Sequence, residues 1–148
     1  MADRRFGATV TIERPIEEVF AFLAEGENDK KFSPRVIEIA KTTEGPPAVG
    51  TVFASTVKDG GVKTKRKFEL TVVESPSRIR WKELSKAPIV VPEGGYDLKP
   101  AGQGTELSFF NELESHGFGK VIMGFALRSA RKGADDFVNS IKRAIEAS

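Results

Sequence analysis

The chain has 148 residues, of which 39% are hydrophobic and 30% are charged, and its formal net charge is +2. This length and composition predict one folded domain over residues 1–148 rather than a disordered segment. The small net charge does not indicate nucleic-acid binding, and a chain without cysteine has neither disulfides nor thiolate-ligated metals. No stretch approaches the roughly 20 apolar residues that a membrane span needs, and no signal peptide is visible, so we predict a cytoplasmic protein.

The first 34 residues predict a strand and two short helices. Apolar and polar side chains alternate over residues 5–12, which is typical of a strand with one buried face. Pro15 and the two following glutamates favour the start of a helix, which Gly26 ends. A second short helix, capped by Asn28 or Asp29, is expected to end at Pro34.

Strands and turns dominate the middle of the chain. The pattern predicts six strands in an antiparallel meander, over residues 35–41, 51–58, 62–73, 78–84, 89–99 and 105–113. Asp59-Gly60-Gly61 is typical of a hairpin turn. In the strand over residues 89–99, Pro92 and Gly94-Gly95 predict a kink or bulge.

A long helix is predicted from Phe118 to Ala147. Its apolar residues recur at steps of three and four, as Met123, Leu127, Ala130, Ala134, Phe137, Ile141 and Ile145. Almost everything before it indicates β-structure, so a curved sheet has to cover its apolar stripe. We therefore expect Phe137 and Ile141 to be buried.

This order of elements resembles the START-like helix-grip superfamily (SRPBCC), which includes polyketide cyclases, dehydrases and lipid-transport proteins. The resemblance covers nearly the whole chain. It rests on Arg14-Pro15-Ile16-Glu17-Glu18-Val19-Phe20, Phe32-Ser33-Pro34-Arg35-Val36, Gly50-Thr51-Val52-Phe53, Tyr96-Asp97-Leu98, Gly104-Thr105-Glu106-Leu107, and Phe137 with Ile141-Lys142. It implies an α+β fold in which a curved antiparallel sheet of about seven strands wraps around the C-terminal helix, with a cavity between them. Members include cyclases, aromatases, lipid carriers, hormone receptors and partner-binding domains, so the fold alone does not select a function.

The residues themselves also favour a cavity. Ala130 and Ala134 are small side chains at the centre of the helix stripe and leave volume there. The alternative is that large side chains from the strands fill this volume. Strand alternation and the helix stripe give the candidate ligand-binding residues Phe53, Ser55, Phe68, Trp81, Tyr96, Phe109, Met123, Leu127, Ala130 and Ala134. Val72 is assigned to the inward face with Phe68, on the assumption that no bulge intervenes.

Polar residues on the same faces are the candidates for chemistry. Glu83 and Asn111 share strand faces with predicted cavity aromatics and are the candidate catalytic residues. Glu83 and Arg66 either pair in the interior or point at a ligand, or they reach solvent at strand ends, which is the interpretation we prefer. His116 is the only histidine and lies in a glycine-rich turn, where we expect it to be exposed. We therefore predict no metal site, and the glycines match no phosphate loop, so we predict no nucleotide cofactor.

Two surface features have alternative interpretations. Lys63, Lys65 and Lys67 at period two predict a solvated strand face, with attraction to anionic lipid as the alternative. Phe118, Val121, Ile122 and Phe125 lie off the main helix stripe. They either pack against the two early helices, mark a helix break at Gly124, or form a mobile gate, a homodimer patch or a membrane contact.

The sequence thus favours a domain that binds one small hydrophobic molecule, lipid-, polyketide- or isoprenoid-like, and no nucleic acid. The alternatives are an enzyme of the cyclase or dehydratase kind that uses the same pocket, and a protein-interaction domain with a filled core. A catalytic activity would here require a shaped apolar pocket and one polar group that moves a proton.

Overall fold

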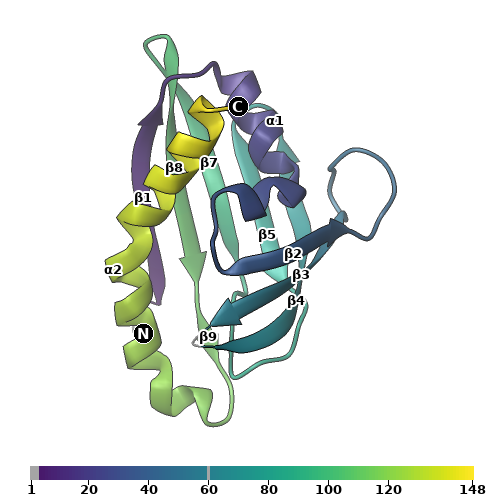
Figure 1. Cartoon of the computed structure of the whole chain (residues 1–148), viewed down its shortest axis with the longest axis vertical. Helices are drawn as coiled ribbons and strands as arrows, with labels where there is room; N and C mark the ends of the chain where they lie inside the picture. Colours follow the sequence, from purple (N-terminus) through teal and green to yellow (C-terminus); the bar gives the residue numbers. More distant parts are fainter. Residues whose placement is uncertain (1–3, 60) are drawn as a thin grey trace.

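The computed structural model describes residues 4–59 and 61–148, and within these residues seven strands form one antiparallel sheet in the order β1-β8-β7-β5-β4-β3-β2 (Figure 1). A long helix, α2, lies across this sheet, and the predicted helix-grip fold is confirmed. The elements are β1 (Arg5–Ile12), α1 (Ile16–Ala24), the 3-10 helix η1 (Gly26–Lys31), β2 (Val36–Lys41), β3 (Val52–Asp59), β4 (Val62–Glu74), β5 (Arg78–Glu83), β6 (Ile89–Val90), β7 (Gly94–Ala101), β8 (Gly104–Glu112), β9 (Glu114–Ser115) and α2 (Gly119–Glu146).

Most predicted elements appear within a residue or two of their expected bounds. The strand expected over residues 89–99 is divided into β6 and β7, with Pro92 in the break because proline has no N–H for a strand ladder. β6 pairs with β9 instead of joining the large sheet. Gly60 lies outside the described residues, and β3 and β4 pair as the predicted hairpin.

The three helical segments cover one face of the sheet (Figure 1). α2 packs mainly against β1, α1 packs on β7 and β8, and η1 packs on β2. Apolar side chains between these layers form the core, and Ile12, Leu107, Ile141 and Ile145 have no exposed surface. The predicted burial of Ile141 is confirmed. Phe137 is only half-buried, although it packs against the core.

Polar contacts fix the C-terminal end of α2 to the end of β1. The Glu146 carboxylate accepts a 2.7 Å hydrogen bond from the Glu13 backbone N–H, and Lys142 Nζ donates to the Thr11 carbonyl at 2.8 Å. Arg14 donates to the Glu146 carbonyl. The long helix is therefore anchored at this end. Neither α1 nor α2, the α-helices of the described residues, is long and apolar enough to cross a membrane.

A bulge in β4 changes which side chains face the core. The pairing with β5 shifts register between Leu70 and Val72, so that Val73 pairs with the buried Ile79 and Val72 pairs with Arg80. Val73, not Val72, packs against the core. The predicted inward position of Val72 was therefore wrong, because one extra residue in a strand exchanges its two faces.

Candidate functional site

An aromatic cluster covers the concave face of β5, β7 and β8. Tyr96 pairs with Ile79 on one side and with Phe109 on the other, so the three residues form a row across the sheet. The Tyr96 ring lies 4.9 Å from the ring of Trp81 and 5.9 Å from that of Phe109, measured between centroids. Phe109 lies 4.7 Å from Phe137 of α2. The cluster thus connects the centre of the sheet to the helix.

Trp81 is held in place by a hydrogen bond that crosses a neighbouring strand. Its indole N–H donates to Asn111 Oδ1 at 3.1 Å, and Gly94 of β7 pairs with both residues and lies between them. A Cβ atom on Gly94 would lie 1.9 Å from Asn111 Oδ1 and 2.4 Å from the indole nitrogen. The glycine provides clearance, and the pairing of β7 continues through it in register. The predicted kink therefore lies at Pro92, in the break between β6 and β7, and not at Gly94-Gly95.

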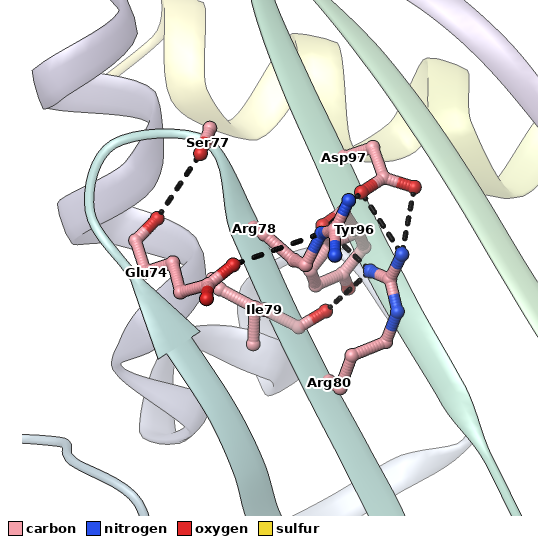
Figure 2. A network of polar contacts seen from close by, with 7 residues as sticks. All are labelled: Glu74, Ser77, Arg78, Ile79, Arg80, Tyr96 and Asp97. Atoms are coloured by element: carbon pink, nitrogen blue, oxygen red, sulfur yellow. Dashed lines mark hydrogen bonds and ion pairs between the residues drawn. The ribbon is translucent and has the colours of Figure 1, made fainter.

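On the opposite face of the sheet, a charged network holds the backbone behind Tyr96 (Figure 2). Arg80 Nη2 contacts both carboxylate oxygens of Asp97 at 3.0 Å, and Nη1 donates to the carbonyls of Ile79 and Tyr96 at 3.0 and 3.2 Å. Arg78 lies 3.5 Å from the same Asp97 carboxylate. Because one guanidinium nitrogen binds the Asp97 carboxylate and the other binds carbonyls of β5 and β7, these charge-assisted hydrogen bonds fix β5 against β7 at the row that carries the aromatic rings.

The ten predicted binding residues fall into two groups. Six are buried, namely Phe53, Ser55, Tyr96, Phe109, Met123 and Ala134. The other four are half-buried, namely Phe68 and Trp81 on the sheet and Leu127 and Ala130 on α2. Because α2 rests mainly on β1, strands β4 and β5 are left less covered, which accounts for the partial exposure of Phe68 and Trp81.

An open concavity of about 550 Å³ lies against β2, β3 and β4. Lys30 of η1 borders it, and Ser55 and Arg66 are among its strand residues. The complete lining is Lys30, Glu38, Ile39, Ala40, Ala54, Ser55, Thr56, Lys65, Arg66 and Lys67. Six of these residues (Glu38, Ala40, Ala54, Thr56, Lys65 and Lys67) pair across the strands on the face opposite to Phe53, Ser55 and Phe68. The concavity therefore lies mainly on that outer face, and its rim is largely cationic.

Glu83, a candidate catalytic residue, is buried and fully engaged by protein groups. Its side chain is 2% exposed, and one carboxylate oxygen accepts from Arg66 Nη1 at 2.8 Å and from the Ser85 hydroxyl. The other oxygen accepts from the Val91 N–H at 2.9 Å. The preferred interpretation, that Glu83 and Arg66 reach solvent at strand ends, was wrong for Glu83. The segment after β5 folds back over the carboxylate and supplies two of its donors.

Asp29 is a residue whose role the sequence did not indicate. Burial, and secondarily the nearby Glu25 carboxylate, raise the pKa of Asp29 from 3.8 to about 7. Burial, and secondarily the Asp29 carboxylate, raise the pKa of Tyr96 well above 10.0. A carboxyl group that is half protonated near neutral pH therefore lies close to Tyr96 in the aromatic cluster.

His116 is far less enclosed. Its side chain is 58% exposed, and Nε2 lies 2.8 Å from a Glu114 carboxylate oxygen that is itself exposed. The predicted exposed position of His116 is confirmed. Across residues 4–59 and 61–148, no three His, Asp or Glu side chains gather as metal ligands would.

The family model for polyketide cyclase / dehydrase and lipid transport matches residues 3–146. The chain belongs to this family. Membership supports a ligand-binding or cyclase role, and the resemblance stated from the sequence is confirmed. A comparison with curated protein sequences gave no match.

Solved structures with the same fold cover nearly the whole chain. TTHA0849 from Thermus thermophilus is 17% identical, with a TM-score of 0.79 over 97% of both chains. The Zhui aromatase/cyclase from Streptomyces sp. R1128 is 17% identical, with a TM-score of 0.77 over 98% of this chain and 94% of its own. Ara h 8.0201 is 15% identical, with a TM-score of 0.66 over 99% of this chain and 100% of its own. At these identities the similarity establishes the fold of the family and not a ligand.

Proposed function

We propose that this protein binds one small, largely hydrophobic molecule, of lipid, polyketide or isoprenoid type, between the concave face of the sheet and the N-terminal half of α2. The observation that carries the proposal is the incomplete burial of inward-facing apolar side chains. Phe68 and Trp81 share a sheet face with the buried Leu70, Leu127 and Ala130 share the helix stripe of the buried Met123 and Ala134, and all four are half-buried. Concave sites lined by apolar and aromatic side chains with a few polar groups are typical of small-molecule binding.

Polar groups at the edges of this region would orient such a molecule. Tyr96 and Asp29 lie at the aromatic end, and Ser55 lies on the inward face of β3 beside the buried Phe53. An apolar chain with an oxygen-bearing end therefore suits the site better than a pure hydrocarbon. The cytoplasmic location predicted from the sequence is part of this proposal.

Ala130→Phe tests the proposal directly. The added ring would occupy the space between α2 and the sheet, so we expect loss of binding of the hydrophobic dye anilinonaphthalene sulfonate with the fold retained. If the space is packed, the same substitution instead lowers the free energy of unfolding by about 1–3 kcal/mol without changing dye binding. Gly133→Phe is the matched control, because a Cβ atom there meets no atom within 4 Å.

Native mass spectrometry of the purified protein, followed by solvent extraction, is the companion experiment. A co-purified lipid or polyketide supports binding. An empty protein whose Ala130→Phe variant shows only overpacking contradicts the proposal and favours the interaction domain with a filled core.

A second candidate function, a cyclase- or dehydratase-type reaction in the same pocket, is favoured by Asp29. A group with a pKa of about 7 exists in both protonation states at neutral pH. Its carboxylate can accept a proton from a carbon next to a carbonyl, and its acid form can donate a proton to a leaving hydroxyl group, which departs as water. If turnover of a polyketide-like substrate is found, Asp29→Asn should lower kcat by about 100-fold and change dye affinity little. Unchanged turnover in this variant would eliminate Asp29 as the acid–base group.

A further inference from the structure

An exposed apolar surface lies at the start of α2 and takes no part in the core. Phe118, Val121, Ile122 and Phe125 have exposed fractions of 67, 84, 42 and 77%. We call these four residues the α2 ridge. Packing against α1 and η1, one of the alternatives raised by the sequence, would have buried them, and that alternative was wrong.

The α2 ridge is held firmly by the opposite side of the helix. Gly119 is buried, and a Cβ atom on it would lie 2.1 Å from the Pro88 carbonyl oxygen. The same carbonyl accepts the His116 N–H at 2.8 Å, and Met123 is 6% exposed. The ridge therefore projects from an anchored turn of helix, at the end of the molecule where α2 begins (Figure 1).

The charges along the first half of α2, which carries the ridge, are of one sign. The segment from Ser115 to Ala134 contains no aspartate or glutamate, and it contains the cations Lys120, Arg128, Arg131 and Lys132. Val121, Phe125, Arg128 and Lys132 follow each other at steps of four, three and four, so they lie along one line of the helix surface. Arg128 and Lys132 are both exposed.

One face of α2 thus carries exposed aromatic and branched apolar groups, followed by cations. This arrangement matches an anionic bilayer, in which acyl chains lie beneath negative headgroups. A second copy of the chain fits less well, because a two-fold contact sets this surface against itself and the segment from Ser115 to Ala134 offers no carboxylate to Arg128 or Lys132. We propose that the α2 ridge docks peripherally on an anionic lipid surface, with Val121 and Phe125 in the acyl boundary and Arg128 and Lys132 at the headgroups. Docking at this ridge does not require that the interior bind a ligand.

Vesicle flotation with the full chain tests this docking. We expect partition onto vesicles of phosphatidylcholine with about one third phosphatidylserine, little partition onto phosphatidylcholine alone, and loss of most binding at about 0.5 M NaCl. Val121→Gln with Phe125→Gln should weaken partition at least tenfold. Arg128→Gln with Lys132→Gln should weaken it about tenfold.

Two control pairs remove the same chemistry elsewhere and should bind as wild type. Val49→Gln with Val62→Gln removes valines that are 66 and 62% exposed. Lys63→Gln with Lys65→Gln removes two exposed cations of β4. Circular dichroism checks that every variant is folded, and light scattering reports the oligomeric state.

Four outcomes would overturn the proposal: no binding to anionic vesicles, equal binding to neutral vesicles, undiminished binding of the Val121/Phe125 pair, or an equal loss in the Lys63/Lys65 control. A wild-type dimer that dissociates in the Val121/Phe125 variant would likewise overturn it, because the ridge would then be a contact between copies. If the Val121/Phe125 variant does not fold, the Arg128/Lys132 pair and its β4 control decide.

Discussion

Asp29→Asn should change the pH dependence of stability in a defined direction. The pKa of Asp29 is 3.8 ordinarily and about 7 in the folded protein, so the folded state binds this proton more strongly than the unfolded state does. Wild type therefore loses stability as the pH rises from about 4 to about 7, and the loss is complete above that range. Asparagine resembles the protonated carboxyl group and does not titrate.

The size of the effect follows from the two pKa values. A gap of about three pH units corresponds to about 4 kcal/mol, because each unit represents about 1.4 kcal/mol. We therefore expect the free energy of unfolding of Asp29→Asn, minus that of wild type, to increase by about 4 kcal/mol from pH 4 to pH 8. Subtracting the two proteins at each pH removes the contributions of every other titrating group that they share.

Urea unfolding followed by the fluorescence of Trp81, the only tryptophan, supplies the measurement. Asp136→Asn is the control, because it removes an exposed carboxylate from α2, away from η1. A difference between wild type and Asp29→Asn that stays flat from about pH 4 to about pH 8 would refute the reasoning, since Asp29 would then titrate at its ordinary pKa.

Gly94→Ala should lower the free energy of unfolding by about 2 kcal/mol, because the new methyl group displaces the hydrogen bond between the Trp81 indole and the Asn111 amide. Gly124→Ala should raise the free energy of unfolding by about 0.5–1 kcal/mol, because the space around its Cβ position is open. Equal effects of the two changes in thermal melts would contradict the clearance role of Gly94. Glu83→Gln should destabilise the fold by about 3 kcal/mol, since it leaves Arg66 without its charged partner, and a change below about 1 kcal/mol would show that the pair is unimportant. His116→Ala should leave ligand affinity and any turnover within about threefold of wild type, and a hundredfold loss would move the active site to the turn before α2.

The fold was predictable because its signals are periodic and local. A buried face can be predicted directly from the alternation of Phe6, Ala8, Val10 and Ile12 in β1, and from the helical stripe through Ile141 in α2. Turn residues then separate the strands, and a run of antiparallel strands followed by one long amphipathic helix leaves few ways to cover the apolar faces.

The candidate site was predictable only in part, because its polar chemistry depends on contacts between distant segments. Asp29 was predicted as a possible helix cap, which was wrong, because η1 begins earlier and Glu25 caps it. Nothing in the local sequence indicates that η1 carries the Asp29 carboxyl group close to Tyr96. Glu83 was expected to reach solvent, because the return of Ser85 and Val91 over it depends on the path of a loop. Val72 was misplaced because a single bulge is invisible to a period-two pattern.

The strand order also determines how the chain can reach this fold. β1 ends at Ile12, and its ladder partner β8 begins only at Gly104. During synthesis the strands from β2 to β5 can pair as soon as they leave the ribosome. β1 has no strand partner until β8 is made, when most of the chain has been synthesised. Closing so long a loop is entropically slow, and α2, which packs on β1, follows it. A nascent chain that stalls before β8 therefore presents a free apolar strand, and the N-terminal segment is where we expect chaperones to be needed most.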